Sequence, residues 1–291
     1  MDKLLIIGGN GFVGANLTMA AHRLRRPVAY TYRSANTAIP EIGHELDLEN
    51  KARIKRCVER TQPDCIIFCA TSGPSGTKDE NYATSVDSVR ELHSLVDTEQ
   101  TRLIYVSTNA VFTGQKGLYS ESDAADVVQN PLDHGHYGVA RAMGEALVLE
   151  NWPNSIIART ADVTGRDVAG RVHRRLGDLI SKLRNEEQVP RYSQCYISPT
   201  LVDDLVKALL EISRSDFKFR GILHLAGPER TTYFGLARLL AEHLSLKSDL
   251  VVMDRSKTED RSLNAEVSSR LIKTRFRVLK EQFSSIFPAA E

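Results

Sequence analysis

Short apolar runs alternate with segments of helical periodicity through the first half of the chain. The apolar runs are typical of buried strands and lie at residues 3–7, 28–32, 64–70, 103–107 and 155–159. Helical spacing of apolar positions is found at residues 12–24, 47–60, 80–97 and 137–149, and we expect Asp47 to cap the second of these helices. Strands that alternate with helices in this way predict βαβ units and a parallel sheet.

The pattern changes after Gly165, which indicates a second, smaller lobe. An amphipathic helix is predicted over residues 172–183, followed by a polar loop through Ser198. Further on we predict helices over 201–212 and 233–243, a strand at 221–225, and a basic helical tail over 265–283.

The first predicted strand runs directly into a glycine-rich turn that precedes a helix. In the spacing GxxGxxG, the first glycine permits a tight turn, the second lets the backbone approach a pyrophosphate, and the third lets the helix pack on the strand. The N-terminus of the helix also offers free N–H groups to phosphates. A turn without a ligand is the alternative, but the strand–turn–helix context favours a dinucleotide site. The loop residues of that site would be Gly8, Asn10, Gly11, Phe12, Val13 and Gly14.

The end of the second strand indicates which dinucleotide is bound. An acidic residue there binds the ribose 2′-hydroxyl of NAD, whereas an arginine accommodates the 2′-phosphate of NADP. This chain has Arg33 and Ser34 and no acid at that point, which favours NADP(H) over NAD(H). The alternative is that Arg33 is an ordinary surface arginine.

Composition narrows the remaining function classes. The 291 residues carry a formal net charge of +1, so no global field favours nucleic acid as a partner. No apolar stretch approaches the roughly 20 residues of a membrane span, and no signal peptide is apparent. The four cysteines form no CxxC pair, which argues against zinc and suits buried thiols in the cytoplasm.

Four further segments complete a set of motifs. They are residues 107–109 (STN), 137–141 (YGVAR), 159–165 (RTADVTG) and 198–205 (SPTLVDDL). Together with the glycine loop they resemble the extended short-chain dehydrogenase/reductase superfamily, and within it the dTDP-4-dehydrorhamnose reductase branch, over nearly the whole chain.

The resemblance implies an α/β fold: a Rossmann-type doubly wound parallel sheet with a small C-terminal substrate-binding lobe. The NAD(P)-binding domain would span residues 1–165 and be completed by about 201–226. The substrate-binding lobe would comprise 166–200 and 227–291.

The resemblance also implies a catalytic set. Tyr137 would give a proton to a substrate carbonyl as hydride arrives from the nicotinamide, and Thr108 would hydrogen-bond the same oxygen. Phenols titrate at about 10, so a nearby cation is needed, and the family places a lysine where this chain has Arg141. Arg141 keeps the charge and can bind ribose hydroxyls, but its guanidinium is larger, so the exchange is not conservative. Alternatively, Tyr137 only packs and Arg141 lies at the surface.

Other family positions concern the cofactor. Asp47 and Leu48 match the segment that lies against adenine. Cys69, Ala70 and Thr71 would line the cofactor, as would Tyr137 and Arg141.

The departures from the branch pattern concern the substrate. Asp162 stands where the branch has tryptophan, and Asn109 where it has aspartate, so a stacking surface for a deoxysugar is lost and a carboxylate is gained. Arg175 belongs to a basic segment, residues 171–175, that could reach a diphosphate or form a solvated face. His134 and His136 lie in a longer loop than the branch pattern, where they are solvated or, alternatively, bind a polar substrate group.

We therefore expect an NADPH-dependent reductase of a ketone, with a nucleotide-linked 4-keto sugar of carbohydrate biosynthesis as the leading substrate. One alternative is an NAD-dependent sugar-nucleotide epimerase or dehydratase. Another is a non-catalytic dinucleotide-binding regulatory subunit, because the β subunit of methionine adenosyltransferase is similar to the same branch. The substrate's identity and the oligomeric state stay open, a homodimer included.

Overall fold

A parallel sheet of seven strands forms the larger part of the molecule. The computed structural model describes residues 2–33, 39–129 and 135–288. The strand order is β10-β6-β5-β4-β1-β2-β3, and every pairing is parallel. The strands are β1 (Leu4–Ile7), β2 (Val28–Tyr32), β3 (Gly43–Glu45), β4 (Cys65–Phe68), β5 (Arg102–Thr108), β6 (Ser155–Thr160) and β10 (Gly221–His224). The order reverses between β1 and β4, and in such sheets ligands bind at the carboxyl ends of the strands at this point.

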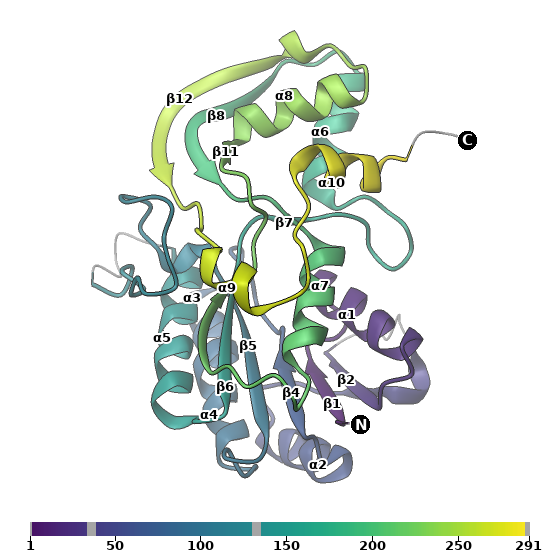
Figure 1. The fold of residues 1–291 in the computed structure, drawn as a ribbon, viewed down its shortest axis with the longest axis vertical. Helices are drawn as coiled ribbons and strands as arrows, with labels where there is room; N and C mark the ends of the chain where they lie inside the picture. The colour runs from purple at the N-terminus through teal and green to yellow at the C-terminus, as the bar shows by residue number, and fades with distance from the viewer. Residues whose placement is uncertain (1, 34–38, 130–134, 289–291) are drawn as a thin grey trace.

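Helices cover both faces of this sheet, which is why the central strands β1 and β4 are apolar throughout (Figure 1). Alternate residues of β1 belong to different cores: Leu4 and Ile6 pack with one set of residues, Leu5 and Ile7 with another. On the first face lie α1 (Phe12–Arg23) and α7 (Val202–Ile212); on the other lie α2 (Lys51–Thr61), α4 (Ser88–His93) and α5 (His136–Asn151). The expected Rossmann-type doubly wound sheet is therefore confirmed.

A smaller unit, called the lobe here, stands above the carboxyl end of the sheet in Figure 1. Its own sheet has the order β11-β8-β12. The lobe consists of α6 (Arg174–Arg184), β8 (Val189–Ile197), β11 (Thr231–Thr232), α8 (Tyr233–His243), β12 (Val251–Asp260) and α10 (Leu279–Ile286). A short pairing of β7 (Val163–Thr164) with β9 (Thr200–Leu201) lies where the chain passes between sheet and lobe.

Two predictions for the lobe are wrong. Much of the stretch expected to be a polar loop through Ser198 is strand β8, which pairs with β12 from far along the chain. Its few buried residues, Val189, Cys195 and Ile197, are too widely spaced to give a local strand signal. The tail is also not one helix over 265–283, because it divides into α9 (Glu266–Leu271) and α10.

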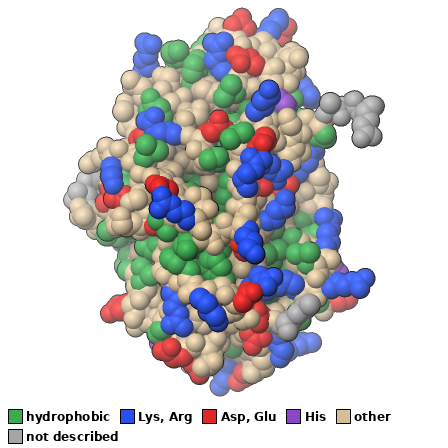
Figure 2. All heavy atoms as spheres, viewed as in Figure 1, with side chains coloured by type: hydrophobic (Ala, Val, Ile, Leu, Met, Phe, Trp, Pro, Cys, Tyr) green, Lys and Arg blue, Asp and Glu red, His purple; other side chains and the backbone are tan. Residues whose placement is uncertain are grey.

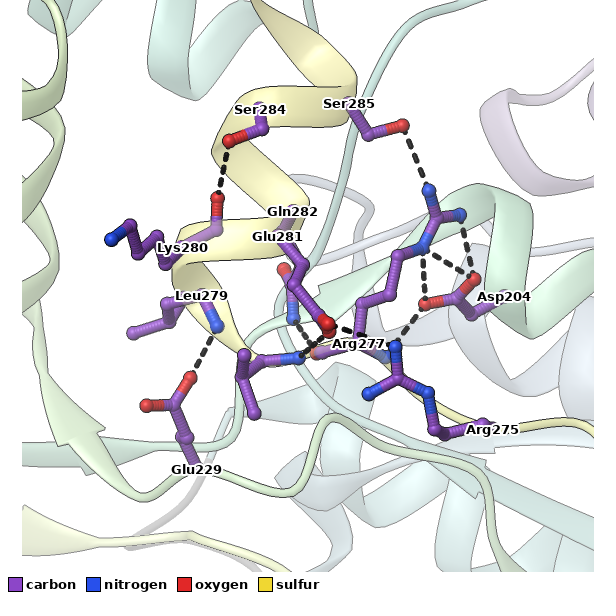
Figure 3. A network of polar contacts seen from close by, with 11 residues as sticks. Asp204, Glu229, Arg275, Arg277, Leu279, Lys280, Glu281, Gln282, Ser284 and Ser285 are labelled. Carbon is purple, nitrogen blue, oxygen red and sulfur yellow. Dashed lines mark hydrogen bonds and ion pairs between the residues drawn. The ribbon is translucent and has the colours of Figure 1, made fainter.

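Two carboxylates hold the chain at the start of α10, one from α7 and one from the segment before β11. Arg277 donates from Nε and Nη2 to Asp204 Oδ1 at 2.9 and 2.6 Å, and its backbone N–H donates to Asp204 Oδ2 at 2.9 Å. Glu229 accepts a bond from the backbone N–H of Leu279 at the start of α10 (Figure 3). The last helix of the lobe is thereby fixed to α7.

The helices expected at 47–60 and 80–97 also differ in detail. Asn50, not Asp47, caps α2, since its Oδ1 accepts the Arg53 N–H at 3.1 Å. The second helix contains α3 (Lys78–Tyr82), a π-helical turn η2 (Ala83–Asp87) and α4. Within the described ranges, no helix combines the length and apolarity needed to cross a bilayer.

Candidate active site

The turn after β1 has the geometry that its glycines suggest. Gly8 has φ +81°, the left-handed region that glycine occupies without strain. A Cβ on Gly14 would lie 2.2 Å from the Gly8 carbonyl oxygen, so α1 packs directly on the turn. A Cβ on Gly11 would meet nothing closer than 3.5 Å, which means that the protein itself does not require glycine there. Gly11 thus leaves open the side from which a pyrophosphate would approach.

A cavity of about 270 Å³ lies at the point where the strand order reverses. Of the residues expected to hold a dinucleotide, those that line it are Gly8, Asn10, Gly11, Arg33, Asp47, Leu48, Cys69, Ala70 and Thr71. Lining residues that the sequence analysis did not single out are Thr31, Tyr32, Leu46, Glu49, Ser72 and Thr84. Thr84 comes from the π-helical turn, a type of irregularity that is frequent at functional sites. We call this space the dinucleotide cavity.

Three of the expected loop residues do not line the dinucleotide cavity. Phe12 and Val13 pack against the hydrophobic core from the first turn of α1, and Gly14 lies beneath them against Gly8. Ser34 lies outside the described residues.

Both signs of charge line the dinucleotide cavity beyond β2. Arg33 is exposed at the end of that strand. Asp47 and Glu49 lie on the segment after β3, where the Asp47 carboxylate accepts the Glu49 N–H at 3.1 Å. Asp47 lines the cavity, whereas the N-cap of α2 is Asn50.

Tyr137 and Arg141 share one face of α5, one helical turn apart. The Arg141 guanidinium lies 5.9 Å from the Tyr137 ring centre and 5.0 Å from that of Tyr105. It donates from Nη2 to the carbonyl oxygen of Ala70 at 2.5 Å, and Ala70 lines the dinucleotide cavity. Arg141 is 2% exposed, so the alternative that it is a surface residue is wrong.

The electrostatic surroundings of Arg141 favour its charged form. Burial acts to lower the pKa of the guanidinium, but the phenols of Tyr105 and Tyr137 raise it, and the net direction is upward. Its Nε and Nη1 atoms are buried without a hydrogen-bond partner among the described residues. Because both atoms have almost no accessible surface, they face the protein interior rather than either cavity, between the phenols of Tyr105 and Tyr137.

Thr108 lies at the end of β5, close to the start of α5. A Cβ on Gly138 would lie 2.1 Å from the Ala110 carbonyl oxygen, so the two segments are in direct contact. The Thr108 hydroxyl donates to Asn109 Oδ1 at 3.4 Å and accepts the Ala110 N–H at 3.2 Å.

A buried ion pair that the sequence analysis missed lies behind this face of α5. Arg159 on β6 donates from Nη2 to Glu145 at 2.7 Å, and the two side chains are 2% and 3% exposed. Ser107, next to Thr108, donates its hydroxyl to the same carboxylate. Glu145 follows Arg141 by one turn, so the pair joins α5 to the strands that end at the candidate site.

A second cavity, of about 630 Å³, lies between the end of β6 and the lobe; we call it the substrate cavity. Asp162 and Arg175 line it as expected for substrate contacts. Asp162 Oδ1 accepts the hydroxyl of Tyr233 at 2.9 Å and Arg175 Nη1 at 3.3 Å. Burial raises the pKa of the Asp162 carboxyl, although its bond with Tyr233 acts in the other direction.

The other two expected substrate residues do not line the substrate cavity, although the Asn109 side chain hydrogen-bonds the Asp162 carboxylate. Asn109 is buried and donates to the Arg261 carbonyl at 3.1 Å. His136 is exposed as the first residue of α5 and is not among the residues that line either cavity. His134 lies outside the described residues.

His173, which the sequence analysis did not single out, lies between the first turn of α1 and the substrate cavity. Its ring centre lies 4.6 Å from that of Phe12 in the first turn of α1, and it lines the substrate cavity. Burial lowers its pKa, as do Arg175 and Arg174, so the ring is neutral near pH 7. No local pattern pointed to His173 or Tyr233, because each meets its partner only through the fold.

The face of the molecule drawn in Figure 2 carries no charge of one dominant sign. Figure 2 shows basic and acidic side chains interspersed over this face, in keeping with the net charge of +1. Recognition of a ligand therefore depends on the residues that line the cavities.

Comparisons with known proteins agree with this architecture. A dTDP-4-dehydrorhamnose reductase of Mycobacterium tuberculosis is 28% identical over 249 residues, which are 83% of this chain and 75% of that protein. A dTDP-4-keto-6-deoxy-D-glucose reductase of Streptomyces niveus is 27% identical over 82% of this chain and 77% of its own length. A dTDP-4-dehydrorhamnose reductase of Bacillus anthracis, solved in complex with NADP, superposes with a TM-score of 0.80 at 18% identity, covering 98% of this chain and 97% of that one.

The family model described as the RmlD substrate binding domain matches residues 2–287, almost the whole chain. The resemblance noted from the motifs is thereby confirmed. This chain belongs to the RmlD substrate binding domain family, within the extended short-chain dehydrogenase/reductases.

Proposed function

We propose that this protein is an NADPH-dependent reductase of a nucleotide-linked 4-keto sugar. Its class, an NAD(P)-dependent oxidoreductase, follows from the family and from relatives that are named reductases. The observation that carries the proposal is the alignment of Tyr137 and Arg141 on one face of α5, with Arg141 bonded to Ala70 at the dinucleotide cavity.

The residues of the dinucleotide cavity fit NADP(H). Gly11 leaves space at the N-terminus of α1 and Arg33 offers a cation for a 2′-phosphate, while Arg141 lies behind the lining and supports it through its bond to the Ala70 carbonyl. When bound, the reduced nicotinamide supplies hydride. Asp47 and Glu49 would lie near the adenosine half, where their carboxylates suit ribose hydroxyls or the adenine amino group.

Residues of this chain would then hydrogen-bond and protonate the carbonyl oxygen of the substrate. Thr108 donates a hydrogen bond to that oxygen, and Tyr137 transfers its phenolic proton to it as the oxygen gains negative charge. The buried guanidinium of Arg141 stabilises the phenolate that remains until the proton is replaced from solvent.

The substrate cavity suits a nucleotide sugar by its size and its charges. Its volume of about 630 Å³ is within the range typical of small-molecule sites. Its lining contains the cations Arg175, Lys182 and Arg191, which can bind a diphosphate, and the carboxylates Asp162, Asp178 and Glu187, which can accept bonds from sugar hydroxyls. The relatives named above act on dTDP-linked keto sugars according to their names, which supports this class over an epimerase or dehydratase.

Oxidation of NADPH against a panel of nucleotide-linked 4-keto sugars and simple ketones tests the proposal. We expect turnover with at least one nucleotide-linked sugar and a lower kcat/KM with every simple ketone. Absence of NADPH oxidation with every member of the panel, from protein that binds NADPH, would overturn the proposal.

A further inference from the structure

A carboxylate and a phenol from different parts of the fold, Asp162 and Tyr233, line the substrate cavity side by side. We call this part of its lining the floor. Asp162 follows β6 directly, and Tyr233 is the first residue of α8 in the lobe. The Tyr233 hydroxyl donates to Asp162 Oδ1 at 2.9 Å, and both residues line the cavity. The pair therefore presents polar atoms to whatever part of a ligand reaches this floor.

The backbone at Asp162 has an unusual conformation. Its φ is +40°, in the left-handed region that few residues other than glycine, asparagine and aspartate adopt. Strained backbone of this kind is concentrated at functional sites, where the surrounding structure maintains it.

The Asp162 carboxylate is incompletely neutralised by the protein. Its side chain is 11% exposed, whereas Arg175, its one ion-pair partner within the described part of the chain, is 62% exposed and lies 3.3 Å away. Solvent weakens the attraction of an exposed cation at that distance, so the carboxylate depends on neutral donors, the Tyr233 hydroxyl and the Asn109 amide. A bound ligand that covered the floor would exclude water and would have to provide a donor of its own.

The chemistry of the floor therefore distinguishes between substituents of a sugar. A hydroxyl would donate to Asp162 and could accept a bond from Tyr233. A ligand with a hydrogen or methyl group at the same place would displace water from the carboxylate and would give it no hydrogen bond in return. Binding of such a ligand would therefore be strongly unfavourable. The related branch has tryptophan at this position, whose ring suits the apolar face of a deoxysugar, so Asp162 changes the preference.

We propose that Asp162 and Tyr233 form a specificity determinant that binds one hydroxyl of the substrate sugar, so that the substrate is a hydroxylated sugar where the branch takes a deoxy one. This inference rests on the proposed function, because it assumes that a nucleotide sugar occupies the substrate cavity. It adds Tyr233 to the site and narrows the substrate class.

Calorimetric binding of inert nucleotide sugars tests the proposal without requiring turnover. The probes are dTDP-glucose and UDP-glucose, followed by monodeoxy analogues of whichever binds more tightly, titrated into protein saturated with NADP⁺. The variants are Asp162→Gly, which tolerates the positive φ, Asp162→Asn and Tyr233→Phe. Asp178→Ala is the matched control, because this carboxylate also lines the cavity but is exposed.

We expect loss of one particular hydroxyl to weaken binding to the wild type by about 30-fold, as for a hydrogen bond to a charged group. In Asp162→Gly the same loss should weaken binding by no more than about threefold, with Asp162→Asn and Tyr233→Phe in between and Asp178→Ala unchanged from the wild type. If Asp162 only links β6 to the lobe, Asp162→Gly should weaken the binding of all sugars equally. The missing hydroxyl would then cost the variant as much affinity as it costs the wild type.

The outcomes separate the two proposals. If every analogue loses the same affinity in the wild type and in Asp162→Gly, or none loses any, the specificity determinant is overturned while the nucleotide-sugar site stands. If Asp162→Gly does not fold, the comparison with Tyr233→Phe decides in the same way. If neither parent sugar binds the wild type, the proposed function fails as well.

Discussion

The guanidinium of Arg141 donates to the carbonyl oxygen of Ala70 at 2.5 Å, which joins α5 to the loop after β4. Arg141 is one turn from Tyr137, and Ala70 lines the dinucleotide cavity. The contact therefore fixes the distance between the phenol and the space in which a dinucleotide would lie. Arginine reaches this carbonyl with Nη2, while Nε and Nη1 have no hydrogen-bond partner among the residues that the structure describes.

Replacement of Arg141 by lysine tests whether it takes the role of the family lysine. We expect Arg141→Lys to keep or raise kcat/KM for NADPH-dependent reduction, because an ammonium on the same face preserves the positive charge. Arg141→Met, which removes the charge but keeps an apolar stem, should lose most activity. Equal activity in Arg141→Met and wild type would show that the charge has no part in the reaction.

Arg33 should determine the preference for NADPH. Arg33→Ala is expected to weaken NADPH binding by about 1–3 kcal/mol through loss of a charge-assisted bond, and to leave NADH binding nearly unchanged. Fluorescence titration with both cofactors measures the difference. Arg53→Ala serves as control, since Arg53 is also partly exposed but pairs with Glu45 outside the cavity lining. An equal loss for the two cofactors contradicts a 2′-phosphate contact.

The buried pair of Arg159 and Glu145 should contribute strongly to stability. Glu145→Gln leaves the Arg159 charge buried without a counter-charge, and we expect the free energy of unfolding to fall by about 3–5 kcal/mol. Urea denaturation measures it. In the exposed pair of Glu266 and Arg270, the corresponding change Glu266→Gln should alter stability by no more than about 1 kcal/mol. If Glu145→Gln and Glu266→Gln lowered the free energy of unfolding by similar amounts, the larger contribution of the buried pair would be contradicted.

His224 should make the protein less stable in mild acid. Burial lowers its pKa to about 4, below the usual 6.5, so between these values the unfolded chain binds more protons than the folded one. The free energy of unfolding should therefore fall as the pH drops from 6.5 towards 4. The advantage of wild type over His224→Gln is expected to shrink by about 2 kcal/mol between pH 7 and pH 5. A constant difference across that range would exclude His224 as a cause.

The sequence predicted those parts of the fold that rest on local patterns. The strands of the central sheet are buried on both faces, so β1, β4 and β5 stand out as apolar runs. In the lobe, β8 has few buried positions and depends on β12 for its pairing, and the local pattern missed both strands.

The same distinction holds for the site. The glycine turn and the loop after β4 were found from motifs, because one short segment contains all the residues of each. Tyr233, His173 and Glu145 escaped notice because their partners come from distant segments. The burial of Arg141 was likewise set by tertiary packing, which its place in a helical motif does not reveal.

The rate of NADPH oxidation by Tyr137→Phe, with the nucleotide-linked keto sugar that the wild type turns over, tests the central claim most directly. The substitution removes one hydroxyl and keeps the ring beside Arg141. The account predicts loss of turnover by at least about 100-fold, within the range for a proton-transferring group, with NADPH binding unchanged. Turnover at the wild-type rate by a variant that binds NADPH normally would contradict it.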